Sequence, residues 1–154
     1  MYKILYNIYE YSHEETTMKR KQARETAFSI LFEYGFDTSV SPLGHYETAI
    51  SVRDVEEDSY VRNVLAGVEA HLADIDAAID AASSNWKKER ISRVSMAILR
   101  LAVYEMFYRE DIPLRVSLNE AVELSKSFDE DKAYGFVNGV LNAIMADGRC
   151  VGQA

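Results

Sequence analysis

The sequence has little cysteine, since Cys150 is its single cysteine among 154 residues. One cysteine can form no disulfide within the chain and cannot supply a cysteine-based zinc site. His13, His45 and His71 are scattered, so a histidine-based metal site is not expected either. We therefore expect a protein without a metal or another cofactor. The single cysteine without a partner fits a reducing cytoplasm.

The sequence also lacks the motifs of common catalytic sites. No glycine-rich phosphate loop is present, because Gly135 and Gly139 fall inside a predicted helix. No candidate nucleophile is paired with a base. Glu105 and Arg109 have the spacing of a surface ion pair on a helix, which is commoner than acid–base catalysis. These absences predict a binding protein rather than an enzyme.

No segment alternates polar and apolar residues with the period of two that is typical of a half-buried strand. The chain is therefore predicted to be all-α, with about seven helices and no repeats. Apolar spacing and turn residues predict helical segments at Gln22–Phe36, Tyr46–Val52, Ser59–Leu72, Ala73–Ala82, Ile91–Tyr108, Leu114–Ser127 and Asp131–Met145. Gly67 lies inside one of them at a cost of about 1 kcal/mol relative to alanine, which favours a close helix crossing.

The segment Ile91–Tyr108 is apolar on nearly every side. A helix of this kind is expected to be buried all round. It is not expected to span a membrane, because a spanning helix needs roughly 18 to 20 uninterrupted apolar residues. Charged residues such as Arg93 and Arg100 interrupt this segment before it reaches that length. We expect the central helix of a soluble bundle, ended by Pro113, with Asp111 available to cap the next helix.

Residues 1–17 differ in composition from the rest of the chain, with four tyrosines among the first eleven positions. No apolar region with a small-residue cleavage site follows, so a signal peptide is not indicated. We expect a disordered extension at 1–17, a helical domain that starts at Met18 and covers 18–147, and a flexible tail at 148–154. The alternative is an arm at 1–17 that docks on the domain or on a partner.

The formal net charge of −8 and the pI near 4.9 argue against a general nucleic-acid coat protein. The placement of charge is more informative, because four cations gather within six residues at the start of the first helix: Lys19, Arg20, Lys21 and Arg24. A helix N-terminus adds its own attraction for phosphate. A local basic patch of this kind can hold phosphates with a strongly salt-dependent affinity. Its alternative role is to keep the protein soluble.

Cations and aromatic residues also interleave near the other end of the chain, at Lys126, Phe128, Lys132 and Tyr134. Single-stranded RNA is commonly held by such a mixture, with phosphates on cations and bases stacked on rings. The structural alternative is that Phe128 fills the junction between the last two helices. The two basic segments are more than a hundred residues apart, so a shared RNA site requires the fold to bring them together.

The sequence from Met18 to about Met145 resembles the NusB family of transcription antitermination factors. The stretches that carry the resemblance are KRKQARETAFSILFEY, VRNVLAGV, AILRLAVYEM, IPLRVSLNEAVELSKSF and FVNGVLN. The resemblance implies a non-enzymatic protein of two three-helix bundles packed across one another. It further implies a pairing with NusE, a small-subunit ribosomal protein, and binding to the boxA element of nascent RNA. That complex joins RNA polymerase and other Nus factors, notably on ribosomal RNA operons.

The resemblance also implies which residues face RNA. The family's arginine-rich start corresponds to Lys19, Arg20, Lys21 and Arg24, and its RNA-facing turn corresponds to Phe128, Asp129 and Lys132, with Lys126 beside it. Lysine at some of these positions lacks the planar fork with which arginine binds phosphate in a bidentate way. Some relatives form dimers that cover the RNA surface, so a homodimer is a further alternative.

Two other functions remain open at this point. The same domain occurs as an accessory RNA-binding module in some RNA cytosine methyltransferases. A helical adaptor that binds only proteins is the second, and in that case the basic patch would be incidental. Binding of boxA RNA with and without NusE separates the antitermination function from the adaptor.

Overall fold

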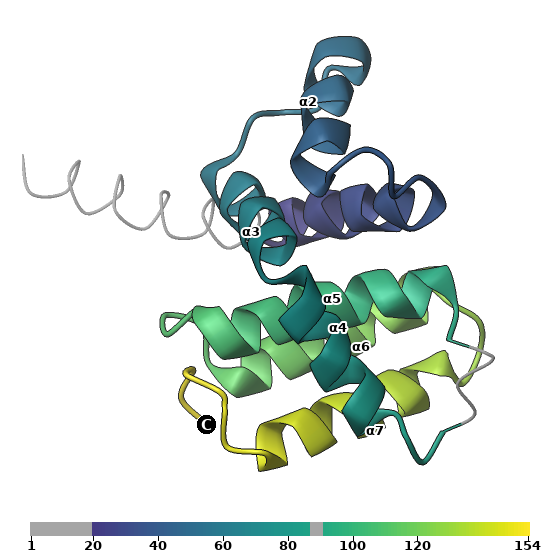
Figure 1. The fold of residues 1–154 in the computed structure, drawn as a ribbon, viewed down its shortest axis with the longest axis vertical. Helices are drawn as coiled ribbons and strands as arrows, with labels where there is room; N and C mark the ends of the chain where they lie inside the picture. The colour runs from purple at the N-terminus through teal and green to yellow at the C-terminus, as the bar shows by residue number, and fades with distance from the viewer. Residues whose placement is uncertain (1–19, 87–90) are drawn as a thin grey trace, which may run out of the picture.

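The computed structural model of the chain describes residues 20–86 and 91–154. Residues 20–36 form the first helix. The later helices are α2 (Pro42–Arg53), α3 (Ser59–Ala70), α4 (Leu72–Ala82), α5 (Arg93–Tyr108), α6 (Leu114–Phe128) and α7 (Ala133–Ala146) (Figure 1). Every regular element in the described part of the chain is a helix, so the prediction of an all-α protein with about seven helices is confirmed.

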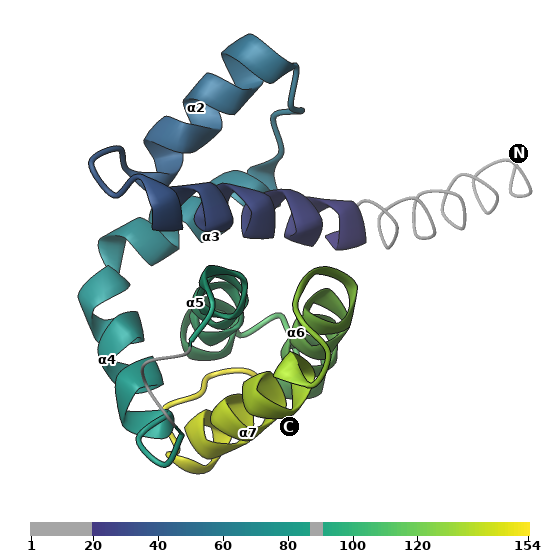
Figure 2. The same cartoon turned by 90° about the vertical axis from the view of Figure 1, so that its right-hand side faces the viewer.

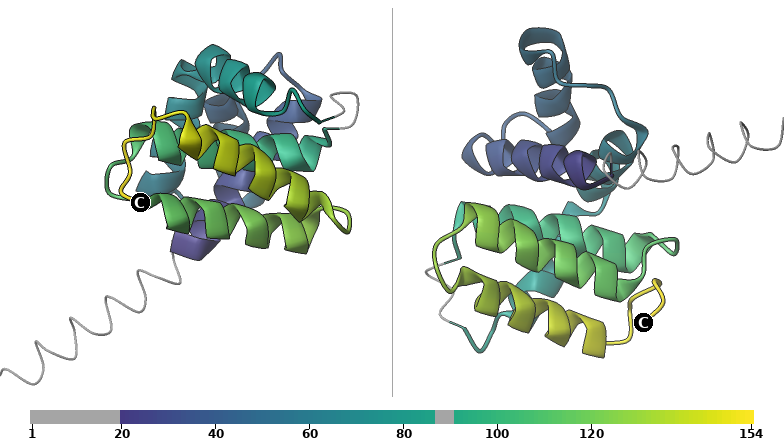
Figure 3. Two further views of the ribbon diagram at one scale, coloured as in Figure 1. Left: turned by 90° about the horizontal axis from the view of Figure 1, so that it is seen from below. Right: turned by 180° about the vertical axis from the view of Figure 1, so that it is seen from behind.

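The helices form two bundles that pack across one another. The first helix, α2 and α3 form the N-terminal bundle, and α5, α6 and α7 form the C-terminal bundle. Helix α4 leads from one to the other and packs against α5 and α7. In Figure 2 the first helix is seen from the side while α5 and α6 below it are seen nearly end-on. Figure 3 shows α6 and α7 running beside each other, and both pack against α5.

Helix α2 begins earlier than the sequence predicts. Ser41 is its N-cap, and the Ser41 hydroxyl accepts a hydrogen bond of 3.0 Å from the Gly44 amide. Pro42 is the first helical residue, where its missing N–H costs nothing and its fixed φ suits the helix. The predicted start at Tyr46 is therefore wrong, because Pro42 already begins the helix.

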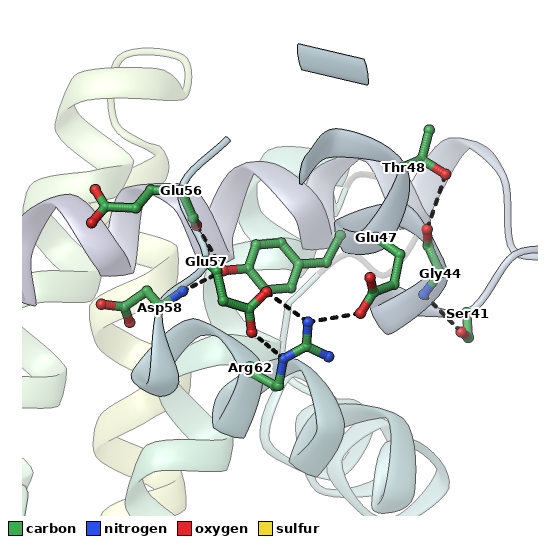
Figure 4. A network of polar contacts seen from close by, with 9 residues as sticks. Ser41, Gly44, Glu47, Thr48, Glu56, Glu57, Asp58 and Arg62 are labelled. Carbon is green, nitrogen blue, oxygen red and sulfur yellow. Dashed lines mark hydrogen bonds and ion pairs between the residues drawn. The ribbon is translucent and has the colours of Figure 1, made fainter. Parts of the chain in front are cut away.

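The connection from α2 to α3 is held by polar contacts (Figure 4). Asp58 caps α3 by accepting a hydrogen bond of 3.0 Å from the Val61 amide. The buried Tyr46 hydroxyl donates to the Glu56 carbonyl and accepts from the Asp58 amide, both at 2.9 Å. Arg62 adds exposed ion pairs beside this corner. The corner therefore has a defined geometry although it contains many charged residues.

Helix α5 is the centre of the molecule. Leu101 and its apolar neighbours are buried, which confirms the prediction for this segment. Gly67 of α3 lies directly against Tyr104 of α5, since a Cβ atom at Gly67 would be 2.0 Å from Tyr104 Cε2. The predicted close helix crossing is confirmed. In residues 20–86 and 91–154, no helix combines the length and the apolar run needed to cross a membrane.

The corner between α5 and α6 differs from the prediction. Helix α5 ends at Tyr108, because Arg109 has extended backbone angles (φ −115°, ψ 96°), so Pro113 does not end it. Asp111 does not cap α6. Its carboxylate instead accepts two hydrogen bonds from the Arg109 guanidinium, at 2.8 and 2.7 Å. A bidentate arginine pair of this kind is stronger than an ordinary cap bond, which explains why Asp111 is used there.

The C-terminal residues 148–154 lie along this same corner. The Val151 amide donates to the Met106 carbonyl at 2.9 Å, and the Leu114 amide donates to the Gln153 carbonyl at 2.7 Å. The predicted flexible tail is thus held by backbone hydrogen bonds that satisfy one end of α5 and the start of α6. The predicted extension at 1–17 lies outside the described residues.

Candidate nucleic-acid interface

The fold places the first helix beside α6, so the two basic segments of the sequence are neighbours. The rings of Phe28 and Phe128 lie with their centroids 5.3 Å apart at an interplanar angle of 35°. One turn or more before Phe28, Lys21 and Arg24 line a hollow that is closed on the other side by Glu120 and Ser127 of α6. The fold thus brings the two segments together, as a shared RNA site requires.

Arg20 and Lys21 lie at the outer end of the first helix. Lys21 is exposed, and Arg20 is half-buried with its guanidinium carbon 4.4 Å from the centre of the Tyr60 ring. A cation over a tyrosine face is attracted by the ring and keeps its charge. Neither side chain forms an ion pair with another residue of the described segments. Lys19, the first residue of the predicted patch, lies outside the described residues.

Arg24 occupies a different environment from its neighbours. Its side chain is only 7% exposed, and its Nε lies 3.0 Å from Glu105 Oε2. Burial alone would lower the pKa of the guanidinium, but the Glu105 carboxylate outweighs it and the pKa lies above its ordinary value. The structure therefore places Arg24 between the two bundles, where its guanidinium faces a carboxylate of the protein instead of the solvent.

Glu105, the partner of Arg24, is buried, whereas the sequence predicts that it lies on the surface. A surface pair with Arg109 is predicted from their spacing, but the Glu105 side chain is 1% exposed. Its carboxylate accepts hydrogen bonds from Arg24, from the Tyr60 hydroxyl and from the Ser117 hydroxyl, the last at 2.8 Å. Burial and the neighbouring carboxylate both raise the pKa of Tyr60, so this hydroxyl remains a donor. A glutamate inside a helix that is apolar all round was the sequence signal for this role.

The end of α6 and the start of α7 present several side chains outward. Phe128 is 51% exposed although it packs on Phe28, and Tyr134 is exposed as well. The Lys126 ammonium lies 5.2 Å from the centre of the Tyr134 ring and 3.9 Å from a carboxylate oxygen of Glu123. Cations and aromatic rings are therefore interleaved on the surface, as they are in the sequence.

Asp129 fixes this segment from inside. Its Oδ2 accepts hydrogen bonds from the hydroxyls of Ser92 and Ser95 at 2.9 and 2.5 Å, which ties the turn to the start of α5. Asp129 is thus used for structure at a position that the resemblance assigns to the RNA-facing turn. Lys132 is exposed and precedes α7 with a left-handed backbone (φ 78°), a conformation costing about 1 to 2 kcal/mol for a non-glycine residue. The surrounding contacts hold the turn in one shape.

The exposed groups of this surface can bind phosphates and stack on bases. Lys21, Lys126 and Lys132 supply the cations, and Phe128 and Tyr134 supply the rings. Carboxylates lie among them, because the hollow beside Lys21 is also lined by Glu25, Glu120 and Glu123. These carboxylates repel phosphate, so the surface favours a nucleic acid that reaches the cations from outside this hollow. In residues 20–86 and 91–154, no three histidine, cysteine or acidic side chains are grouped to hold a metal ion.

A row of phenylalanines continues from this surface along the first helix, and the sequence analysis missed it. Phe28 and Phe32 stack with their centroids 6.3 Å apart, and Phe32 and Phe36 meet edge to face at 4.9 Å. Phe36 is 60% exposed, and the Arg93 guanidinium carbon lies 4.3 Å from its ring centre. The spacing of four residues between the rings was the available signal, since it puts them on one helix face.

Comparison with known sequences identifies close relatives. A sequence model described as the NusB family matches residues 21–146. The transcription antitermination protein NusB of Bacillus subtilis (strain 168) is 46% identical over 131 residues, which cover 84% of this chain and 97% of that protein. The protein of the same name from Clostridium acetobutylicum is 39% identical over 130 residues, which cover 83% of this chain and 96% of that protein.

Solved structures show the same fold. NusB of T. maritima superposes with a TM-score of 0.73 at 28% sequence identity, covering 83% of this chain and 91% of that chain. A crystal structure of the antitermination factors NusB and NusE in complex with double-stranded RNA contains a chain with a TM-score of 0.72 at 27% identity. That match covers 83% of this chain and 96% of the other.

Proposed function

The chain belongs to the NusB family, and we propose that it is a transcription antitermination factor that binds boxA of nascent RNA together with NusE. The relatives named above are transcription antitermination proteins, and a solved relative forms a complex with NusE and RNA. The activity is binding and not catalysis. The complex joins RNA polymerase and other Nus factors in the cytoplasm, notably on ribosomal RNA operons.

The observation that carries this proposal is the exposed surface at the junction of the first helix and α6. Lys21, Lys126 and Lys132 contact RNA phosphates there, and Phe128 stacks on a base. Arg20 adds a further cation at the edge, above the Tyr60 ring. Lys19 stays a prediction of the same kind. Arg24 lies beneath this surface and supports it, because its buried guanidinium forms an ion pair with Glu105 and not with RNA.

The acidic character of the whole protein shapes how this surface works. The net charge of −8 repels nucleic acid at long range, while the local cations attract phosphates within about a Debye length of 8 Å at physiological salt. We therefore expect weak binding of RNA by the protein alone and a steep loss of affinity with added salt. A second protein that supplies additional contacts would raise the affinity.

For NusE we favour the row of phenylalanine rings along the first helix, in which Phe36 is exposed and Phe32 is partly buried. An exposed apolar surface bordered by polar groups is typical of a protein interaction site. Phe36 and Phe32 supply the apolar part, and Arg93 lies at its border. The row is continuous with Phe128 through Phe28, so a protein docked there would lie beside the proposed RNA surface.

A gel-shift titration of boxA RNA with the protein, with and without NusE, tests the proposal. Binding at low salt that NusE strengthens is expected, and an RNA of the same length with a scrambled boxA should bind more weakly. No shift at low salt in either case would overturn the proposal and leave a protein-binding adaptor as the better account. Light scattering on the same samples would reveal a homodimer.

A further inference from the structure

The buried carboxylate of Glu105 connects the two bundles. It belongs to α5, and it receives hydrogen bonds from Arg24 on the first helix, from Tyr60 on α3 and from Ser117 on α6. Arg24 and Tyr60 reach the same oxygen, Oε2, while Ser117 reaches Oε1. One side chain thus touches both helices of the N-terminal bundle that face α5, and also the helix that carries Lys126.

A buried charge of this kind is not explained by stability alone. Taking a carboxylate and a guanidinium out of water is costly, and well-packed apolar residues of similar size often give equal or greater stability. What a fully satisfied buried pair supplies is a single preferred arrangement of the elements that it joins. Both carboxylate oxygens of Glu105 are satisfied here, so the pair specifies how the first helix lies on α5 and α6.

This arrangement decides where the surface cations lie. Arg24 follows Lys21 by about one helical turn, and both side chains line the hollow against Ser127 of α6. A rotation of the first helix that released Arg24 would also carry Lys21 away from α6. Tyr60, which is bonded to Glu105, provides the ring on which the Arg20 guanidinium lies 4.4 Å from the centre.

We propose that Glu105 is a positioning residue for the RNA-binding surface. It acts through Arg24, which sets the rotation of the first helix and the place of Lys21, and through Tyr60, which supports Arg20. Glu105 itself contacts no RNA, since it is buried. This inference rests on the proposed function and adds to it a residue that is buried between the two bundles.

The substitution Glu105→Gln tests the proposal through the sign of its effect. A carboxylate acting only through its charge repels RNA, so its removal would tighten binding. A positioning role requires the reverse, and we expect boxA RNA affinity to fall by about tenfold at a temperature where the variant is folded. The matched control is Glu120→Gln, which removes an acidic group beside the same arginine and is expected to leave the affinity equal or higher.

A double variant separates position from charge. Arg24→Gln alone leaves Glu105 buried without its partner and should weaken RNA binding. In the double variant Arg24→Gln with Glu105→Gln, two amides can hydrogen-bond in place of the ion pair, and RNA affinity should return to within about threefold of the unmodified protein. If Arg24 contacted RNA directly, the double variant would bind as weakly as Arg24→Gln, and the proposal would be overturned.

Hydrogen exchange provides a measurement that does not depend on RNA. Backbone amides of residues 21–28 should exchange faster in Glu105→Gln and recover in the double variant, because the first helix is less firmly docked in the single variant. Unchanged exchange in Glu105→Gln, with normal RNA binding by the unmodified protein, would overturn the positioning role alone. Absence of RNA binding by the unmodified protein, with and without NusE, would overturn the proposed function and the inference that rests on it.

Discussion

The two halves of the proposed RNA surface are built in opposite ways. At the start of the first helix the cations are dense in the sequence, yet Arg24 is buried and Arg20 lies on a tyrosine ring, so that only Lys21 is fully exposed among the described residues there. In the last turn of α6 and the turn that follows it the cations are sparse, but Lys126 and Lys132 are both exposed. The density of charge along a sequence is therefore a poor measure of the charge that a surface offers.

Helix periodicity explains the difference. Arg24 lies between Ala23 and Ala27 on the face of the first helix that is buried against the rest of the protein, whereas Lys21, about one turn earlier and nearer the end of the helix, is exposed. A cation on the buried face is tolerated only where a carboxylate can pair with it, and Glu105 supplies that carboxylate. Lys126 lies on the exposed side of α6 and Lys132 lies in the turn that follows, so both cations stay in solvent.

The largest effect, on stability, is expected from a substitution that removes the buried ion pair between Arg24 and Glu105. Arg24→Ala leaves the Glu105 carboxylate buried without its cation, and we expect the free energy of unfolding to fall by about 3 to 5 kcal/mol. Lys21→Ala, the exposed neighbour on the same helix, should change it by less than about 0.5 kcal/mol. Urea unfolding followed by circular dichroism measures both. Equal effects of the two substitutions would contradict the contrast between the buried and the exposed cation.

A smaller effect, on binding, is expected from the exposed half. Phe128→Ala removes the ring proposed to stack on a base, which should cost about 1 to 3 kcal/mol of RNA-binding free energy. Phe128→Tyr keeps the aromatic face and should bind nearly as well as the unmodified protein. Fluorescence anisotropy with labelled boxA RNA gives the two affinities. If both variants bound equally well, Phe128 would only fill the junction with Phe28.

The lysines of the turn should set the salt dependence. Replacing Lys126 and Lys132 together with alanine should make the slope of log affinity against log salt less negative by about 1.4, or about 0.7 for each lost phosphate contact with single-stranded RNA. Unfolding should be almost unaffected, because both side chains are exposed. Titrations at several salt concentrations check this. An unchanged slope would remove the two lysines from the proposed surface.

The smallest effect concerns an exposed ion pair. The hydrogen bonds from Arg109 hold the pKa of Asp111 at about 2, below the unfolded value of about 3.9. Because the folded pKa is the lower one, the pair stabilises the protein above about pH 4, and this contribution is lost as the pH falls through 2. Asp111 is largely exposed, so we expect less than about 1 kcal/mol.

Unfolding titrations of Asp111→Asn between pH 2 and pH 7 test this pair. The variant should differ from the unmodified protein at pH 7 and converge with it near pH 2. A difference at pH 7 as large as that of Arg24→Ala would show that exposed pairs matter here as much as the buried one.

The sequence predicts those features that depend on neighbouring residues. The periodicity of three and four residues locates the helices, and Gly67 marks a close crossing. Two helix boundaries differ from the prediction, because α2 begins at Pro42 and not at Tyr46, and α5 ends before Pro113. The effect of a proline on a helix depends on where the proline lies relative to the end of that helix. In this protein the ends of the helices depend on contacts with other parts of the fold.

Contacts between distant residues are the part that the sequence does not predict. Arg24 and Glu105 are 81 positions apart, and no local pattern links them. The nearest residue with a suitable spacing, Arg109, misleads because it has its own partner in Asp111. The exposed side chains of the candidate surface were proposed from composition and from the family resemblance, while the buried role of Arg24 required the structure.

Lysine footprinting tests most directly whether the exposed cations bind RNA. Acetylation of the protein in the presence and absence of boxA RNA and NusE, followed by mass spectrometry, reports the accessibility of each lysine. We predict that RNA, added to the complex with NusE, slows acetylation of Lys21, Lys126 and Lys132. Equal acetylation rates at these three lysines with and without bound RNA would contradict the account.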